Sequence, residues 1–207
     1  LIVKFYRPKR WTKNMILDEH ACLQALSQAE INVIPPLQFN ETTLFEMDDL
    51  IFAIFPKKGG RVLDELTNTQ WEEVGRLLAR THQVQSTLPH TTRQTWRPNM
   101  ATKNHLDTLL NQNVIPAKYI KVVTEKIQKF ITTYDPLFDK TLLQLIHGDC
   151  HFGNIIARPE EGLCLIDFDD IVVGPVIQDC WMLMPDTIEK CEREITWLAK
   201  GYETFNP

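Results

Sequence analysis

Closely spaced cysteines are missing from this sequence, and so is any long apolar run. The five cysteines among 207 residues are scattered, with no C-x-x-C pair: Cys22, Cys150, Cys164, Cys180 and Cys191. This usage excludes a disulfide framework and a zinc-finger spacing, and it predicts a reducing, cytosolic compartment. The longest apolar stretch, residues 171–177, is interrupted by Gly174-Pro175 and is too short to span a bilayer.

An excess of positive charge is also missing. The chain has 22 Lys and Arg residues against 27 Asp and Glu residues, a formal net charge of −5. A bulk electrostatic grip on nucleic acid or on an anionic membrane is therefore not expected. Hydrophobic residues make up 43% and charged residues 24%, which excludes disordered and fibrous classes. Leu1 lies inside an expected strand, so we expect the chain to be a fragment of a longer protein.

The first quarter of the chain predicts a small strand–helix–strand unit. Thr12 predicts the N-cap of a helix over about residues 13–29, where apolar residues follow helical spacing. Strands are expected at residues 1–6, 43–47 and 50–55, the last two joined by a turn at Asp48-Asp49. The polar segment 56–60 is the expected boundary between two lobes, residues 1–56 and residues 57–207.

After this boundary the pattern becomes mostly helical, with an embedded hairpin. Helices are expected over residues 67–85, 102–112, 116–133, 174–181 and 186–205. Strands are expected over residues 142–146, 154–157 and 163–166, the last two paired across a turn at 158–162. The layout predicts a cleft between the two lobes, which is where ligands commonly bind.

The most informative stretch runs from residue 145 to residue 170. It places polar side chains at the ends of apolar strands: His147, Asp149, His151, Asn154, Asp167, Asp169 and Asp170. Loops at strand ends are where functional sites are built. Asn154 follows Asp149 by five residues, and Asp167 follows on the next hairpin. Protein kinases use a catalytic Asp, an Asn five residues later and a further metal-binding Asp in this order.

These residue types suit an in-line phosphoryl transfer. Such a reaction needs a carboxylate to orient and deprotonate the attacking hydroxyl. It also needs hard oxygen ligands for magnesium that leave room for phosphates and water, and Asp and Asn provide such oxygens on short side chains. Turn formation alone would be a poor explanation for three such residues at this spacing.

The departures from the protein-kinase pattern narrow the family. Gly148 replaces the Arg of H-R-D, Asp169 replaces the Gly of D-F-G, and Gly174-Pro175-x-x-x-Asp179 stands where A-P-E is expected. The combination resembles the aminoglycoside phosphotransferase and choline kinase branch of the kinase-like fold, whose catalytic loop reads H-G-D-x-H-x-x-N. Within this branch, a bacterial family of stress-response kinases carries segments similar to VKFYRPKRW, FAIFP, HGDCHFGNI and LIDFDD…GPVIQDCWML in the same order.

The resemblance implies an α+β, protein-kinase-like fold of two lobes, truncated at both ends. It also implies ATP and Mg²⁺ as cofactors and a serine or threonine of a protein as acceptor. Asp149 would accept the proton of the attacking hydroxyl, and Asn154 and Asp167 would be the magnesium ligands. Lys4 would contact the α- and β-phosphates, with Glu19 as its partner.

The resemblance assigns further residues around this centre. Backbone groups of Ile54 and Phe55 would hydrogen-bond adenine at a hinge, and Asp179 would brace the catalytic loop. His147 is expected to anchor the loop by hydrogen bonds and not to take part in the chemistry. The glycine-rich hairpin that precedes the strand lysine in this family is absent from the sequence given.

Several alternatives stay open at this point. Lys4 could be a solvent-facing lysine on an edge strand. The neighbouring residue Asp18 is an alternative to Glu19 as the partner of Lys4. The same catalytic loop serves small alcohols, so a small-molecule kinase is the second hypothesis, and a nucleotide-binding module without turnover is the third. A binuclear metallophosphoesterase is disfavoured because Gly153-Asn154 lacks a following His. The remaining histidines show no ligand spacing and receive no predicted role: His20, His82, His90 and His105.

Overall fold

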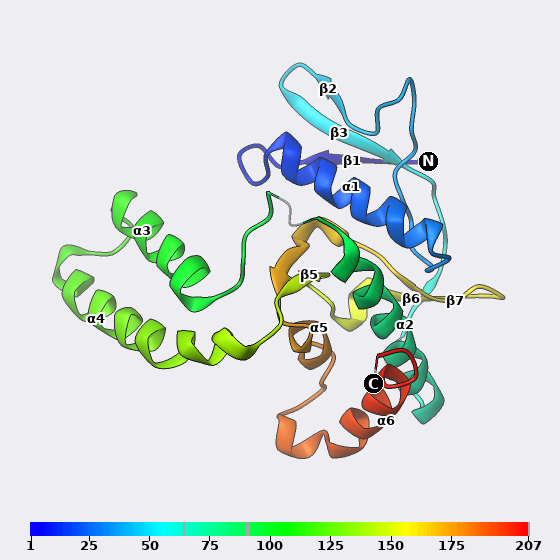
Figure 1. The fold of residues 1–207 in the computed structure, drawn as a ribbon. Helices are drawn as coiled ribbons and strands as arrows, with labels where there is room; N and C mark the ends of the chain where they lie inside the picture. The colour runs from blue at the N-terminus through cyan, green and yellow to red at the C-terminus, as the bar shows by residue number, and fades with distance from the viewer. Residues whose placement is uncertain (64, 90–91, 207) are drawn as a thin grey trace.

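The chain opens with a three-stranded antiparallel sheet that lies over a helix (Figure 1). The computed structural model describes residues 1–63, 65–89 and 92–206; His90 lies outside them. In the sheet, β3 (Leu50–Phe55) pairs with both β1 (Ile2–Tyr6) and β2 (Phe45–Met47). Asp48 and Asp49 both adopt left-handed backbone angles, as a tight hairpin turn requires. The predicted strands and turn are confirmed.

The helix under this sheet begins where the sequence predicts. In α1 (Lys13–Gln28), the Thr12 Oγ1 accepts a hydrogen bond from the Met15 amide at 3.2 Å, which satisfies one amide that the helix itself leaves unpaired. The buried face of α1 carries apolar residues, among them Ile16, Leu23 and Leu26. Glu19 and His20 are buried on the same helix, and buried polar side chains need partners.

Two smaller sheets frame the segments that carry the candidate site. One has the order β4 (Arg61–Val62), β6 (Ile155–Arg158), β7 (Gly162–Leu165), and the other pairs β5 (Gln144–Ile146) with β8 (Val172–Gly174). The β6–β7 hairpin is confirmed. Neither β4 nor β8 was predicted from the sequence, because both are very short and pair with strands far along the chain.

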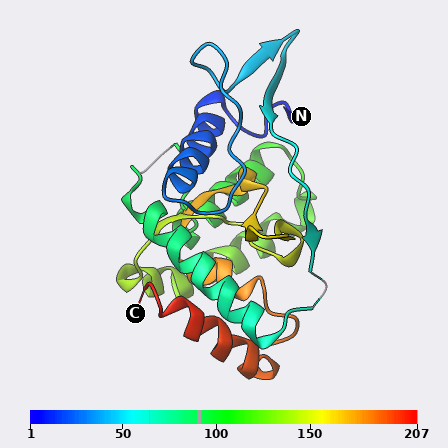
Figure 2. The same ribbon diagram turned by 90° about the vertical axis from the view of Figure 1, so that its right-hand side faces the viewer.

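The helical part is held together by a close crossing of α2 (Asn68–Thr87) and α6 (Glu192–Tyr202), visible in Figure 2. A Cβ atom on Gly75 would lie 2.1 Å from the Leu198 carbonyl oxygen, and one on Gly201 would lie 2.0 Å from that of Glu72. The two glycines therefore let the backbones approach closely. The end of the chain that was expected to be helical from residue 186 forms α6 only from Glu192, after a 3₁₀ turn at Ile188–Lys190.

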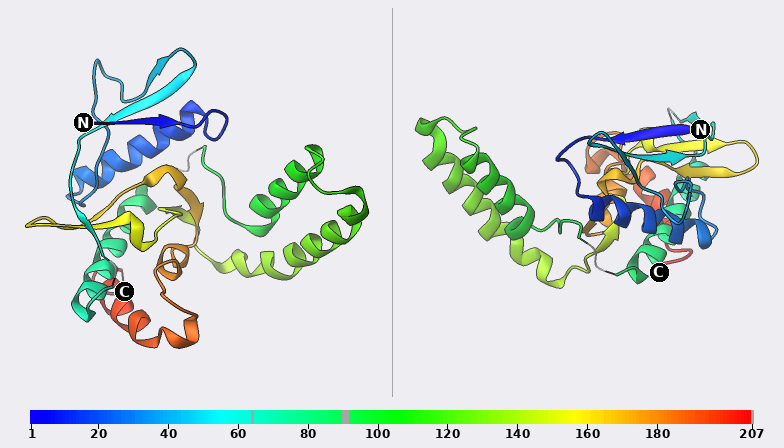
Figure 3. Two further views of the ribbon diagram at one scale, coloured as in Figure 1. Left: turned by 180° about the vertical axis from the view of Figure 1, so that it is seen from behind. Right: turned by 90° about the horizontal axis from the view of Figure 1, so that it is seen from above.

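A helical hairpin projects from the rest of the structure (Figures 1 and 3). It consists of α3 (Lys103–Asn111) and α4 (Ala117–Tyr134), close to the predicted bounds, and follows a π-helical turn at Pro98–Thr102. The remaining short helices are α5 (Ile177–Trp181) and 3₁₀ turns at Asp135–Lys140, Phe152–Asn154 and Phe168–Asp170. Within the described ranges, no helix combines the length and the apolar character that crossing a membrane requires.

The largest core cluster joins α1 and α2 to the two small sheets. Its fully or nearly fully buried members include Leu23, Leu78, Leu165 and Phe168. Phe168 lies between Asp167 and Asp169, so the core fixes the segment that carries these two carboxylates. The five cysteines are free thiols, as the sequence predicts.

Candidate active site

The loop between β5 and β6 is held from inside the protein by His147. This side chain is fully buried. Its Nε2 lies 3.0 Å from the Ile166 carbonyl oxygen, and its Nδ1 accepts a hydrogen bond from the Asp149 amide at 3.3 Å. His147 is therefore an anchor that joins the loop to the end of β7, and the predicted anchoring by hydrogen bonds is confirmed.

Gly148 explains one departure from the protein-kinase pattern. Its φ is +82°, and a Cβ atom would lie 2.2 Å from the Asp170 carbonyl oxygen. The left-handed conformation and the close approach both exclude a larger side chain. A glycine is thus required where protein kinases have Arg, because this loop packs directly on the segment after β7.

Asp179, in α5, braces the same loop as predicted. Its Oδ2 accepts a hydrogen bond from the His147 amide at 2.8 Å, and its Oδ1 accepts one from the Gly148 amide at 2.9 Å. His82 Nε2 lies 3.0 Å from Oδ2. Burial acts to raise the pKa of Asp179, but the contacts with His82 and the amides outweigh it and hold this pKa below its ordinary value.

His82 is a structural residue that the sequence did not single out. It is fully buried on α2, and its Nδ1 lies 2.8 Å from the Tyr202 hydroxyl group of α6. It therefore links the packed pair α2 and α6 to Asp179 and so to the loop between β5 and β6. No local spacing indicates this role, because both partners lie far along the chain.

Asp179→Asn is expected to lower the free energy of unfolding by about 2–4 kcal/mol, because the neutral amide turns a donor toward one of the two buried amides. Urea denaturation would measure the loss. The matched control is Asp186→Asn, which breaks an exposed ion pair with Lys190 and should cost less than about 1 kcal/mol. Equal losses in the two variants would refute the bracing role.

Asp149 and Asn154 lie together in this loop. The Asn154 Nδ2 donates a hydrogen bond to the Asp149 carbonyl oxygen at 2.8 Å and lies 3.4 Å from its Oδ2. These contacts fix which end of the buried Asn154 amide is the nitrogen, and so orient its oxygen. The Asp149 side chain is 36% exposed, and His151 Nε2 lies 3.7 Å from its Oδ2. The Asp149 carboxylate is therefore accessible from solvent to a hydroxyl group of another molecule.

Cys150 belongs to the same loop but to its buried side. The thiol is fully buried, and burial raises the pKa of the Cys150 thiol well above its ordinary value. A protonated, inaccessible thiol is not a nucleophile. Cys150 thus fills space in the core, as the sequence suggested.

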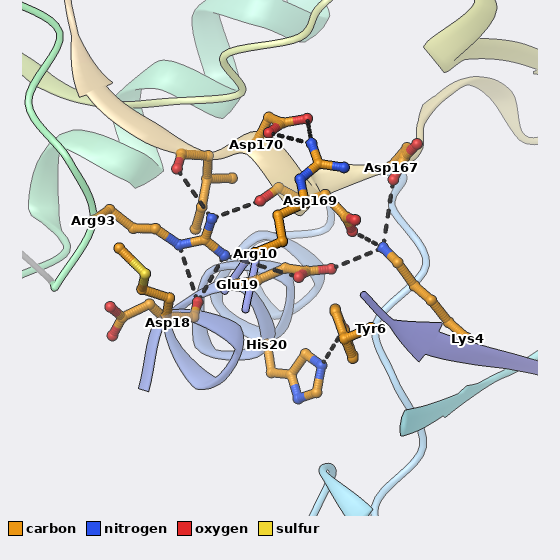
Figure 4. A network of polar contacts seen from close by, with 12 residues as sticks. Lys4, Tyr6, Arg10, Asp18, Glu19, His20, Arg93, Asp167, Asp169 and Asp170 are labelled. Carbon is orange, nitrogen blue, oxygen red and sulfur yellow. Dashed lines mark hydrogen bonds and ion pairs between the residues drawn. The ribbon is translucent and has the colours of Figure 1, made fainter. Parts of the chain in front are cut away.

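Lys4 brings three segments together (Figure 4). Its Nζ lies 3.3 Å from Glu19 Oε1 and 3.4 Å from Asp167 Oδ1, and it also contacts the Asp169 carboxylate. The Lys4 side chain is 25% exposed, so it is not the solvent-facing lysine of the alternative interpretation. Asp169, which received no predicted role from the sequence, joins this group.

Glu19, and not Asp18, is the carboxylate beside Lys4. The Glu19 side chain is 1% exposed, whereas Asp18 accepts hydrogen bonds from the Thr92 amide and hydroxyl groups at 2.9 and 2.7 Å. Burial raises the pKa of Glu19 above its ordinary value, although the positive charges of Lys4 and Arg93 act in the opposite direction. The buried carboxylate is therefore held close to two cations.

Asp167 occupies an unusual backbone conformation at the end of β7. Its φ and ψ are 61° and 66°, in the left-handed region, which Asp tolerates better than most residues. The side chain is 54% exposed. The conformation directs a solvent-accessible carboxylate toward Lys4 while Phe168, the next residue, fills the core.

His20 lies on α1 next to Glu19 and makes the stability of the fold depend on pH. Its Nε2 lies 2.9 Å from the Tyr6 hydroxyl group, and its Nδ1 lies 2.7 Å from the Thr43 hydroxyl group. Burial, reinforced by the charges of Lys4 and Arg93, lowers the pKa of His20 to about 4. Below pH 6.5, the ordinary pKa of about 6.5 means that His20 is protonated in the unfolded chain. In the folded protein the His20 imidazole stays neutral down to about pH 4.

His20→Gln is expected to flatten the acid side of the stability profile. Because the folded-state pKa is lowered, the stabilisation by His20 is present above pH 6.5 and is lost as the pH falls toward 4. The wild type should lose about 2 kcal/mol more than the variant between pH 7 and pH 5. Urea denaturation at both pH values would measure this, with the exposed His105→Gln as control. Parallel profiles for wild type and His20→Gln would contradict the assignment.

A cleft of about 440 Å³ opens beside Lys4, Glu19 and Asp167. Its walls are apolar, and include Leu23 and Leu165. Of the two predicted hinge residues, Phe55 lines the cleft and Ile54 does not. The Ile54 carbonyl oxygen already accepts a hydrogen bond from the Leu37 amide at 2.7 Å. The cleft thus has an apolar body and a charged end.

The donor set suits a hard cation that is only partly ligated by protein. Among the described residues, no three or more His, Cys, Asp or Glu side chains gather into a group that could hold a metal ion. The predicted pair, Asn154 and Asp167, provides an oriented amide oxygen and an accessible carboxylate. Two such oxygens fit Mg²⁺, which commonly takes one or two protein carboxylates or amides and completes its shell with phosphates and water.

Comparison with known proteins agrees with the fold and with the motifs. The model of the phosphotransferase enzyme family matches residues 1–206. Stress response kinase A of Shigella flexneri is 35% identical over 99% of this chain and 62% of that protein. The serine/threonine protein kinase RdoA of Salmonella typhimurium is 34% identical over 98% of this chain and 61% of that protein. The chain thus spans less than two thirds of the length of these curated relatives.

A solved structure matches the fold as well. An amicoumacin kinase in complex with AMP-PNP and Ca²⁺ superimposes with a TM-score of 0.80, at 21% identity, over 99% of this chain and 66% of that chain. The α+β, kinase-like fold expected from the sequence is confirmed. Because the family model matches residues 1–206, nearly the whole of this chain, the chain belongs to the phosphotransferase enzyme family.

Proposed function

We propose that this protein is an ATP- and Mg²⁺-dependent phosphotransferase that transfers the γ-phosphate of ATP to a serine or threonine hydroxyl group of a protein. The observation that carries the proposal is the meeting of Lys4, Glu19 and Asp167 at the charged end of an apolar cleft. Three segments that are distant in sequence contribute these side chains, so the fold brings one cation and two carboxylates together beside the cleft.

In this proposal the cleft takes the nucleotide. The apolar walls would accommodate the adenine base, and Phe55, one of the two predicted hinge residues, lines the cleft. Lys4 contacts the α- and β-phosphates, and the buried Glu19 holds the ammonium group in place. The Ile54 carbonyl oxygen is already bonded to Leu37, so we assign the adenine contact to Phe55. The cleft would lie between the lobes formed by residues 1–56 and 57–207.

The acceptor hydroxyl is activated at the other end of the centre. Asp149 is exposed to solvent, and its loop is fixed by His147 and Asp179. Its carboxylate orients the hydroxyl group and accepts its proton. Asn154 and Asp167 would hold Mg²⁺, which would neutralise the charge on the β- and γ-phosphates.

The acceptor class is drawn from the relatives. The proteins that share about a third of their residues with this chain are named as stress response or serine/threonine protein kinases. A small alcohol is the second candidate, because the structure that superimposes with a TM-score of 0.80 is that of an amicoumacin kinase. The Asp149 carboxylate contacts only the attacking oxygen and cannot by itself distinguish these acceptors.

The two candidates can be separated by an acceptor panel. Full-length protein would be incubated with γ-labelled ATP and Mg²⁺, with a generic protein substrate and, separately, with aminoglycosides, choline and related alcohols. Asp149→Asn serves as the inactive control. Label on protein that disappears in the variant would support the proposal, and label on a small alcohol alone would favour the second candidate. ATP binding without transfer to any acceptor would contradict both and favour a nucleotide-binding module.

A further inference from the structure

Arg93 is a buried cation that the sequence did not single out. It lies at a bend between α2 and the π-helical turn that precedes α3, and its side chain is almost inaccessible to solvent. The next residues are pinned to β8, because the Gln94 carbonyl oxygen accepts a hydrogen bond from the Val173 amide at 3.0 Å. Arg93 thus starts from a fixed backbone and extends toward the candidate site (Figure 4).

One side of the Arg93 guanidinium group holds α1. Its Nε and Nη2 donate hydrogen bonds to the Met15 carbonyl oxygen at 3.0 and 2.7 Å, one helical turn before Glu19. Nη2 lies 3.9 Å from Glu19 Oε2, a buried oxygen with no hydrogen-bond partner among the described residues. The Trp11 ring stacks at 4.8 Å from the guanidinium carbon. Arg93 therefore positions the helix that presents Glu19.

The other side of the guanidinium group holds the segment after β7. Its Nη1 donates to the Asp169 carbonyl oxygen at 2.5 Å and to that of Ile171 at 3.4 Å. The Asp169 carboxylate in turn contacts Lys4. The contacts form a closed circuit that runs from Lys4 to Glu19, through α1 to Arg93, and back through Asp169 to Lys4.

We infer that Arg93 is the positioning residue that couples the Lys4–Glu19 pair to the Asp167–Asp169 segment. The inference rests on the proposed function, in which the first pair binds the phosphates and Asp167 holds the metal ion. The guanidinium group has five N–H donors in a fixed planar arrangement, so it can bind two separate segments of backbone simultaneously. A lysine at this position keeps the charge but cannot make the same set of contacts.

The chain offers a matched control on the same segment. Arg97 also pairs through Nε and Nη2, at 2.9 and 2.8 Å, but with Asp135 at the end of α4. Neither Arg97 nor Asp135 is among the residues that line the cleft. Arg97→Lys and Arg97→Ala thus remove a comparable arginine contact without altering the circuit around Lys4.

The first test does not depend on activity. Amide hydrogen exchange would be compared in full-length wild type, Arg93→Lys and Arg97→Lys. Arg93→Lys should speed exchange both in α1 around residues 15–20 and in residues 168–172, because one side chain holds both. Arg97→Lys should leave both regions unchanged. Faster exchange in only one region, or in neither, would overturn the coupling whether or not the protein transfers phosphate.

The second test measures the kinetics of phosphoryl transfer. Arg93→Lys is expected to lower kcat about 10–100-fold and to raise the Mg²⁺ concentration needed for half-maximal rate, with the acceptor KM unchanged. Guanidine at low millimolar concentration should partly restore the activity of Arg93→Ala and should not change the activity of Arg97→Ala. If Arg93→Ala does not fold, Arg93→Lys decides. An active wild type with unaltered kinetics in Arg93→Lys would overturn the inference alone, whereas an inactive wild type would overturn the proposed function.

Discussion

Asp149→Asn is expected to lower the rate of phosphoryl transfer by about 10²–10⁴-fold and to leave the affinity for Mg-ATP within about twofold of the wild type. The carboxylate acts on the acceptor hydroxyl, so its loss removes the base without removing a nucleotide contact. The fold should survive, because the buried hydrogen bonds of this residue are made by its amide to His147 and by its carbonyl oxygen to Asn154.

Initial rates and calorimetric titration with Mg-ATP would check the two parts of this expectation. Asp186→Asn, which removes an exposed carboxylate far from the loop in sequence, controls for the change of charge. A variant that folds normally but no longer binds Mg-ATP would show that Asp149 belongs to the nucleotide site. A variant with the wild-type rate would show that no base is needed at this position.

Asp167→Asn is expected to weaken nucleotide binding only when Mg²⁺ is present. Asp167 presents an accessible carboxylate beside Lys4, and its replacement removes a charged metal ligand. The loss of affinity for Mg-ATP should be at least the roughly 10–100-fold that even a supporting contact contributes to a metal site. Without metal, ATP should bind the variant as well as the wild type, because Lys4 and Glu19 are unchanged and Lys4 has lost a competing carboxylate.

Calorimetric titrations with ATP, in excess Mg²⁺ and in EDTA, would separate the two conditions. The melting temperature of each protein shows that the comparison is made between folded chains. If the affinity for ATP depends on Mg²⁺ equally in wild type and Asp167→Asn, Asp167 is not a metal ligand. Weaker binding in EDTA would instead mean that Asp167 positions Lys4 and does not act through a metal ion.

The elements that local chemistry defines could be predicted from the sequence. Thr12 and Thr67 accept the hydrogen bonds that begin α1 and α2, and helical spacing of apolar residues gives their extent. The Asp48-Asp49 turn follows from residues that tolerate left-handed angles. The short strands β4 and β8 could not be predicted in the same way, because their stability comes from partners far along the chain.

The same distinction holds for the candidate site: some of its residues could be predicted from a local stretch of sequence, and others could not. The spacing of Asp149, Asn154 and Asp167 is visible in one continuous stretch, whereas the support around them is not. His82 has its partners in α5 and α6, and Arg93 binds carbonyl oxygens, which leave no trace in the residue types around them. Buried polar residues that brace a site through the backbone become visible only once the chain is folded.

The most direct test of the proposed centre is a crystal structure of the full-length protein with AMP-PNP and Mg²⁺. The expected result is a magnesium ion about 2.1 Å from the Asn154 amide oxygen and the Asp167 carboxylate. Lys4 should contact the α- and β-phosphates, and Asp149 should face the γ-phosphate across an open acceptor site. A nucleotide outside the cleft lined by Lys4, or a magnesium ion held by other side chains, would contradict the account.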